Sequence, residues 1–263
     1  MRLGAMPYVE GLLARGRRTF TRAEAASALQ VSPVALYSAM LRLRRRGWLA
    51  MPRRGFFLIV DPAHRGMGAL PPATWIDDLM RHHRARYYVG LLSAAAMHGA
   101  SQQSPQEFQV VTNAILRPLI VGRVRIAFFY RHRMELAATG QMKTPGGPVP
   151  VSTPEMTAYD LVRYRKGAGS LDHAATVIAE LAERMDAGRL LAIAGRSREY
   201  PVIQRLGYIL ERIHRPGLAR PLSGLIHTAR PAATILEPGG RRAGARRNTR
   251  WSLLVNVRIE AEA

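Results

Sequence analysis

The chain has 263 residues, of which 48% are hydrophobic and 22% charged, a composition that excludes a disordered protein and allows one large or two ordinary domains. Lysines and arginines number 39 against 18 acids, and the formal charge of +21 favours a polyanionic partner such as nucleic acid. Because there is no cysteine, disulfides, thiolate zinc sites and cysteine nucleophiles are excluded. We expect a cytoplasmic protein, since no segment approaches about 18 uninterrupted apolar residues and the first residues lack the apolar core of a signal peptide.

The first predicted elements are two short helices. An amphipathic stretch from Pro7 to Arg15 predicts the first of them. Thr21 and Glu24 have the spacing of a capping box, in which the threonine hydroxyl accepts from the backbone three residues on and the glutamate reaches back. A helix is therefore predicted from Thr21 to Leu29, and its alanines allow a further helix to pack closely.

That further helix is predicted from Pro33 to Arg46. Ser32 can cap it, Pro33 suits its first position, and Gly47 can end it. One stripe of the helix is apolar and is expected to pack inward: Leu36, Ala39, Met40 and Leu43. In a helix-turn-helix the opposite, polar stripe enters the DNA major groove. We expect four side chains near base edges, namely Ser32, Tyr37, Ser38 and Arg42, and two on phosphates, namely Arg44 and Arg45.

A basic hairpin is predicted next. Trp48 to Met51 and Phe56 to Val60 have the composition of strands around a turn of Pro52 to Gly55. This hairpin would be the wing of a winged helix-turn-helix, with Arg53 and Arg54 at its tip on phosphates or in the minor groove. The alternative is a helical pair whose arginines are only solvated. The order of capping box, Ser-Pro turn, glycine stop and basic hairpin favours DNA binding.

The stretch from Asp61 to Pro72 is rich in glycine, proline and small residues, which predicts a connection that few contacts cross. We therefore predict two domains, a winged helix-turn-helix at residues 1–62 and a second domain at residues 73–263. The expected fold class is α+β, in which the second domain is itself mixed and combines a small sheet with a helical block.

The first half of the second domain predicts two helices and a small sheet. The helices are expected at Trp75 to Met80, capped by Thr74, and at Tyr87 to His98. Strands are expected at Glu107 to Thr112 and at Gly122 to Tyr130. The segment from Val149 to Val151 contains a proline and is at best an edge strand.

The second half predicts helices first and an irregular, basic extension afterwards. Capping residues or prolines predict helix starts at Thr153, Ser170, Asp186 and Pro201. Residues 215–250 are rich in proline, glycine and arginine, and no regular element is predicted there. Trp251 to Ile259 predicts one last strand, whose place in a sheet the sequence does not give.

Three segments after the basic winged helix support a resemblance to a known family: LSAAAMHG at residues 92–99, PQEFQVVT at 105–112 and STPE at 152–155. With the winged helix, they resemble the AbiEi-like antitoxins of type IV toxin-antitoxin (phage abortive infection) systems over roughly residues 5–215. The resemblance implies an N-terminal domain that binds inverted repeats in the promoter of its own operon and represses it. It also implies a C-terminal antitoxin domain that counteracts a nucleotidyltransferase toxin without forming a stable complex. No enzymatic activity, cofactor or metal is expected.

The sequence also allows two other classes of function. Glu107 and Gln109 on a strand, with Asp77 or Asp78 upstream, faintly resemble a metal-dependent nuclease site, although two carboxylates would have to converge on the metal. Tyr87 and Tyr88 could stack on single-stranded bases, or they could be half-buried against the sheet. The chain could also be a plain winged-helix regulator with no toxin partner, which the neighbouring gene would reveal.

Overall fold

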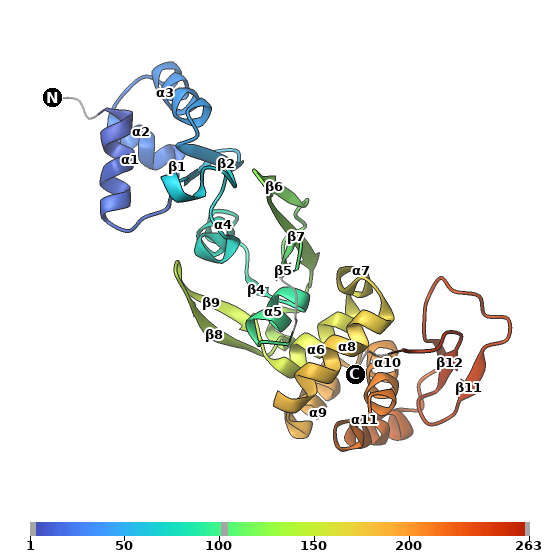
Figure 1. Cartoon of the computed structure of the whole chain (residues 1–263). Helices are drawn as coiled ribbons and strands as arrows, with labels where there is room; N and C mark the ends of the chain where they lie inside the picture. Colours follow the sequence, from blue (N-terminus) through green and yellow to red (C-terminus); the bar gives the residue numbers. More distant parts are fainter. Residues whose placement is uncertain (1–3, 101–104, 261–263) are drawn as a thin grey trace.

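The computed structural model describes residues 4–100 and 105–260 as an elongated molecule with three hydrophobic cores along its length. A winged helix lies at one end, a six-stranded sheet in the middle, and a block of helices with a small C-terminal sheet at the other end (Figure 1). This mixed α+β architecture confirms the fold class predicted from the sequence. Among the described residues, no helix combines the length and the apolar character needed to cross a bilayer.

The N-terminal unit has the element order of a winged helix-turn-helix. Its elements are α1 (Ala5–Ala14), β1 (Thr19–Thr21), α2 (Arg22–Leu29), α3 (Pro33–Arg45), β2 (Leu49–Arg53) and β3 (Phe56–Ile59). The three strands form an antiparallel sheet in the order β1-β3-β2. The short strand β1 was not predicted, because three residues give too little pattern and the strand depends on its pairing with β3.

The predicted caps are present at both helices of the motif. The Thr21 hydroxyl accepts from the Glu24 amide at 3.2 Å, and the Glu24 carboxylate accepts from the Thr21 amide at 2.6 Å. Ser32 accepts from the backbone amide of Ala35 at 3.2 Å, at the start of α3. Leu36, Met40 and Leu43 are buried as predicted, whereas Ala39 is only partly buried.

The predicted turn of the wing was wrong by two residues. Pro52 and Arg53 belong to β2, and only Arg54 and Gly55 form the turn. Proline is tolerated here because β2 is an edge strand and its register with β3 shifts between Ala50 and Arg53.

The central sheet has six strands in the order β6-β7-β5-β4-β9-β8. They are β4 (Tyr87–Val89), β5 (Phe108–Thr112), β6 (Leu119–Val121), β7 (Val124–Tyr130), β8 (Thr139–Thr144) and β9 (Gly147–Ser152). Alternate residues enter different cores. Val89 and Val110 pack toward α4 (Ile76–His82) and the winged helix, whereas Tyr88 and Val111 pack toward the helical block.

Three predictions for this region were wrong. Tyr87 to His98 is not one helix, because Tyr87–Val89 pairs with both β5 and β9 and α5 (Leu91–Met97) begins only after Gly90. The 149–151 segment is not an edge strand, because β9 lies between β4 and β8. Thr74 does not cap α4; it closes a 3-10 turn, and Trp75 precedes the helix.

The segment between the winged helix and the sheet takes part in the core, contrary to the expectation that few contacts cross it. Ala69 and Leu70 are 1% and 3% exposed and share a core with Phe56 and Leu58 of the wing. The Trp75 indole donates to the carbonyl of Leu70 at 3.0 Å. The inner face of the wing therefore packs against the central sheet.

The helical block confirms the four predicted helix starts. Its helices are α6 (Pro154–Arg163), α7 (Arg165–Ala168), α8 (Leu171–Leu181), α9 (Ala187–Ser197), α10 (Tyr200–Arg212) and α11 (Pro216–Ala229). Thr153, Ser170 and Asp186 each accept from a backbone amide at their helix start, and Pro201 lies in the first turn of α10.

The segment after Arg215, for which no element was predicted, contains a helix and short strands. Helix α11 forms although Pro221 lies inside it, because its apolar face, which includes Leu218, Leu222 and Ile226, is buried in the core of the block. Three short strands follow: β10 (Thr234–Ile235), β11 (Arg246–Asn248) and β12 (Leu253–Val255). The last predicted strand is thus shorter than residues 251–259, and it lies between β10 and β11.

Trp251 attaches this C-terminal segment to the helical block. Its side chain is fully buried against α10, and its indole donates to Glu211 at 2.5 Å. A methyl group added at Gly207 would overlap the indole ring. We expect Gly207→Ala to lower the free energy of unfolding by about 1–3 kcal/mol, because the indole must leave its position. Urea unfolding followed by tryptophan fluorescence measures the effect.

Gly224→Ala is the matched control for that substitution. Gly224 also lies inside a helix, α11, but an added methyl group would meet open space. There the change is expected to be neutral or stabilising by up to about 1 kcal/mol, because alanine favours the helix. Equal stability of the two variants would show that Trp251 does not hold the C-terminal segment against α10.

Candidate nucleic-acid interface

The outward face of α3 carries most of the side chains predicted to meet DNA. Tyr37 is 62% exposed, and Arg42, Arg44 and Arg45 are exposed on the same helix. Ser38 is half-buried. The buried apolar stripe holds the helix in place, so its outward side chains are presented by a rigid support.

Ser32 is exposed at the start of α3, but its hydroxyl already accepts the amide of Ala35. A serine hydroxyl that accepts one hydrogen bond can still donate its proton. Val34, which was not among the predicted contacts, is 76% exposed on the first turn of α3. A large exposed apolar side chain at the N-terminal end of this helix is the signal that could have identified it, since such groups can contact the thymine methyl group.

The electrostatic field of this face is almost unopposed by local acids. Residues 25–60 contain no aspartate or glutamate and six arginines, at positions 42, 44, 45, 46, 53 and 54. A surface with one sign of charge attracts a polyanion over distances of about a Debye length, roughly 8–10 Å at physiological salt. The arrangement therefore suits a phosphate backbone.

The two arginines of the wing lie in different surroundings. Arg54 is exposed at the turn, whereas Arg53 is half-buried and donates to the backbone carbonyl of Arg117. The Arg53 guanidinium also lies 6.0 Å from the centre of the Phe128 ring, and burial lowers its pKa. Arg54 is therefore exposed, as the arginines of α3 are, whereas Arg53 points toward the central sheet.

The three family-like segments of the second region meet through polar side chains. The Gln109 amide accepts from the Leu92 amide at 2.8 Å and donates to the Gly167 carbonyl at 2.7 Å. His98, at the end of α5, lies 2.7 Å from the carbonyl of Ser152. Residues 92–99, 105–112 and 152–155 are thus joined into one structural unit around the sheet.

A buried ion pair lies beneath this unit. Asp160 and Arg131 are 0% and 2% exposed, and the Arg131 guanidinium donates to the Asp160 carboxylate at 3.1 Å. The Tyr88 hydroxyl donates to the other oxygen at 2.7 Å. Burial raises the pKa of Asp160 to about 6, although Arg131 and Tyr88 act in the opposite direction.

The residues considered for a nuclease site do not converge. Asp77 and Asp78 pair with Arg81, and Tyr87 donates its hydroxyl to Asp77 at 3.1 Å. Gln109 is used in the contacts described above. Within residues 4–100 and 105–260, no group of three or more His, Asp or Glu side chains has an arrangement that could hold a metal ion. Of the two interpretations of Tyr87 and Tyr88, burial against the sheet is the one observed, because Tyr87 is half-buried, Tyr88 is buried and both hydroxyls have partners.

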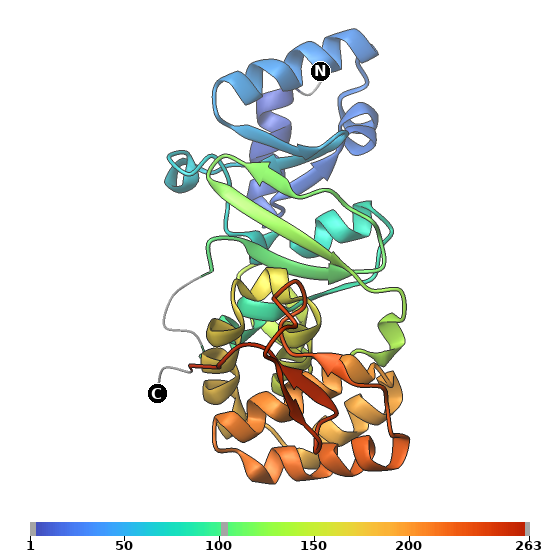
Figure 2. The same ribbon diagram turned by 90° about the vertical axis from the view of Figure 1, so that its right-hand side faces the viewer.

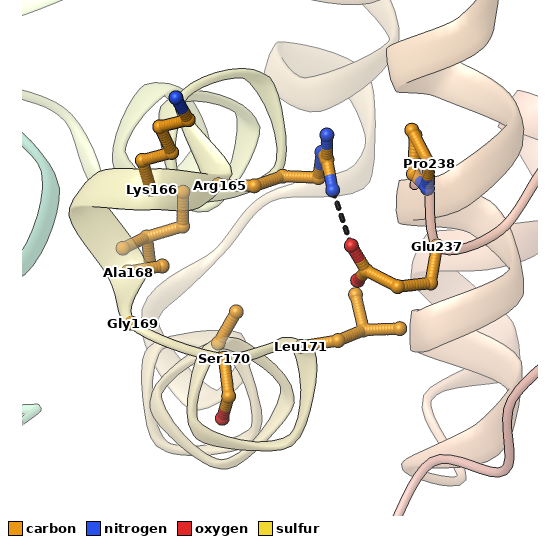
Figure 3. A pocket seen from close by; sticks show the side chains of 10 residues that line it. Arg165, Lys166, Ala168, Gly169, Ser170, Leu171, Glu237 and Pro238 are labelled. Atoms are coloured by element: carbon orange, nitrogen blue, oxygen red, sulfur yellow. Dashed lines mark hydrogen bonds and ion pairs between the residues drawn. The ribbon is translucent and has the colours of Figure 1, made fainter. Parts of the chain in front are cut away.

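A cavity of about 240 Å³ lies between the turn that joins α7 to α8 and the C-terminal segment (Figure 3). Arg165 reaches across it to Glu237, with 2.5 Å between the charged groups, while Lys166 extends away from that pair. Ser170 is already the cap of α8. The polar groups of the cavity thus attach the C-terminal segment to the helical block.

Two family models match this chain, one in its N-terminal part and one in its second region. Residues 88–212 match the AbiEi antitoxin C-terminal domain, and residues 10–60 match a model described as a transcriptional regulator, AbiEi antitoxin. The chain belongs to the AbiEi-like antitoxin family. This AbiEi-like protein therefore has the roles of antitoxin and transcriptional regulator that the family carries. No curated protein matched its sequence.

Two solved structures were compared with this AbiEi-like antitoxin. The crystal structure of the RV2827C protein from Mycobacterium tuberculosis is 18% identical and superposes with a TM-score of 0.70, over 97% of this chain and 92% of that chain. It shows that the whole fold occurs in a known protein. An antigenic nucleotidyltransferase-like protein from Paracoccidioides brasiliensis is 11% identical, with a TM-score of 0.39 over 57% of this chain and 89% of that chain.

Proposed function

We propose that this AbiEi-like antitoxin binds inverted repeats in the promoter of its own operon and represses transcription. The observation that carries the proposal is the outward face of α3, where exposed arginines stand beside Tyr37 in a segment without acids. A winged helix places such a face in the major groove. The formal charge of +21 adds an attraction to DNA that is independent of sequence.

The proposed contacts divide into base readout and backbone positioning. Ser32, the N-cap of α3, and Tyr37, Ser38 and Arg42 precede Arg44 and Arg45 along the helix and are assigned to base edges. Arg44, Arg45 and Arg54 are assigned to phosphates because they are exposed and lie at the end of α3 and on the turn of the wing. Arg53 was predicted on phosphate too, but its contacts with Arg117 and Phe128 favour a role in positioning the wing.

Footprinting on the DNA upstream of the gene tests this function. At about physiological salt, where non-specific charge binding is weakened, we expect protection of two paired half-sites. A reporter fused to the same promoter should be repressed. Uniform coating of the DNA, or no protection at all, would contradict a sequence-specific autorepressor.

Arg42→Ala tests base readout by a single side chain. An arginine that forms a bidentate contact with guanine contributes about 1–3 kcal/mol of discrimination, so the variant should lose about 5- to 150-fold of its preference for the promoter. The affinity of this variant for unrelated DNA should fall much less, because the arginines assigned to phosphates remain. Competition binding with promoter and scrambled duplexes measures the ratio; an unchanged ratio would remove Arg42 from base readout.

We further propose that the second region counteracts a nucleotidyltransferase toxin encoded beside this gene, without a stable complex. The support is the match of residues 88–212 to the antitoxin domain of the family. Co-expression of the full chain with the neighbouring gene product should restore growth, while size-exclusion chromatography of the mixed proteins should show separate peaks. If the full chain does not restore growth, the toxin assignment is wrong, and a plain regulator becomes the better description.

A further inference from the structure

A second acid-free segment of the chain lies in the central sheet. Residues 108–134 contain five arginines and no aspartate or glutamate. Three of these arginines are exposed on the hairpin of β6 and β7 and the turn before it: Arg117, Arg123 and Arg125. None of the three forms an ion pair with another described residue. Their charges are therefore open to an external partner.

Contacts at both ends hold this hairpin, at one end against the wing and at the other against the segment that follows the winged helix. At one end, Arg53 of the wing donates to the carbonyl of Arg117 and lies over Phe128 of β7. At the other end, the Arg123 amide donates to the carbonyl of Met67 at 2.8 Å, and Gly122 is so close to that backbone that a side chain would not fit. The hairpin and the wing therefore form one continuous support.

The β6–β7 hairpin lies directly beside the winged sheet in both views of the molecule (Figures 1 and 2). Figure 2 shows α3, the winged sheet and the β6–β7 strands in succession from the top of the molecule downward. Another exposed arginine cluster, at residues 241–247, is on the C-terminal segment at the opposite end. Of these two clusters, the β6–β7 arginines are the ones that lie next to the wing.

We propose that Arg117, Arg123 and Arg125 form a second phosphate-binding surface, which extends the DNA interface from the winged helix onto the central sheet. The ligand is the backbone of the same duplex, beyond the bases that α3 contacts, and the proposal rests on the proposed DNA-binding function. Arginine is suited to phosphate because its planar guanidinium donates two parallel hydrogen bonds. Fixation by the contacts of Arg53 and Gly122 lowers the entropy cost of binding.

The test is the salt dependence of DNA binding by the full chain. In one variant Arg117, Arg123 and Arg125 become glutamine; in the control Arg241, Arg242 and Arg246 become glutamine, which removes the same charge from the opposite end. The slope of log K against log salt should fall by about 0.9 for each phosphate that the variant no longer neutralises, or about fivefold in affinity per phosphate at 0.15 M salt. The control should change much less, and the footprint of the first variant should be shorter at the edges of each half-site.

Equal slopes for the two triple variants would overturn the proposal, because the effect would then be that of net charge alone. If the slopes are equal and the hairpin variant also fails to restore growth when it is co-expressed with the toxin, the surface binds a protein partner instead. Ile115 and Ile120 on this surface are 88% and 66% exposed. The winged helix is tested separately by changes in α3. If those changes leave binding intact, the proposed function fails; if they abolish it and the hairpin variant binds like the control, only the second surface fails.

Discussion

Replacing Arg42, Arg44 and Arg45 together with alanine is expected to weaken promoter binding by about 3–5 kcal/mol. One base-reading arginine contributes about 1–3 kcal/mol, and each phosphate contact about fivefold in affinity, or about 1 kcal/mol, at 0.15 M salt. All three side chains are exposed on α3. The loss, about 150- to 5,000-fold in the dissociation constant, can be measured by fluorescence anisotropy with a labelled promoter duplex.

Two controls separate this loss from unfolding. Exposed arginines contribute little to stability, so the melting temperature and the circular dichroism spectrum should remain those of the wild type. The salt slope should fall by about two, for the two phosphate contacts, and the arginine variant at residues 241, 242 and 246 should keep near-normal affinity. Wild-type affinity of the α3 variant would contradict the proposed function, which assigns the DNA interface to α3.

Asp160→Ala is expected to lower the free energy of unfolding by about 3–5 kcal/mol at pH 7.5. At that pH the Asp160 carboxylate is ionised, since its pKa is raised only to about 6. Its removal leaves Arg131, which is 2% exposed, without its counterion, and leaves the Tyr88 hydroxyl without its acceptor. An unpaired buried charge is far more costly than the pair itself. Chemical denaturation with an unchanged m-value measures the loss.

Matched variants distinguish burial from the mere loss of an ion pair. Glu183 forms a pair with Arg215 at the surface, where it is 73% exposed, so Glu183→Ala should cost less than about 1 kcal/mol. The double variant Arg131→Met, Asp160→Leu replaces the buried pair by apolar groups and should recover much of the stability lost in Asp160→Ala. If the single and double variants are equally unstable, the unpaired charge is not the cause.

The winged helix and the buried ion pair belong to different cores of one chain. The winged helix has its own core, yet Phe56 and Leu58 of the wing pack with the central sheet. Arg131 directly follows β7 of this sheet, and Asp160 lies on α6 of the helical block, so the ion pair joins the two. Asp160→Ala should therefore disturb antitoxin activity at lower temperature than it disturbs promoter binding, which a paired growth and reporter assay can resolve.

The sequence by itself determined where several helices of this protein begin and end. The capping box of Thr21 and Glu24, the Ser32-Pro33 start and the glycine stop are short-range signals, so the helix-turn-helix was predictable without knowledge of any distant contact. The same applies to the later helix starts at Thr153, Ser170 and Asp186. The buried apolar stripe of α3 determines which side of the helix faces inward. The helical period then predicts that the arginines on the opposite side are exposed.

Tertiary structure alone decided the features that depend on distant partners. Tyr87–Val89 is a strand because β5 and β9 pair with it, and α11 tolerates Pro221 because its apolar face is buried. Arg53 turns inward because the carbonyl of Arg117, 64 residues away, accepts its hydrogen bond. Local sequence sets capping, period and charge, whereas strand pairing and the direction of a long side chain are set by groups that only the fold brings near.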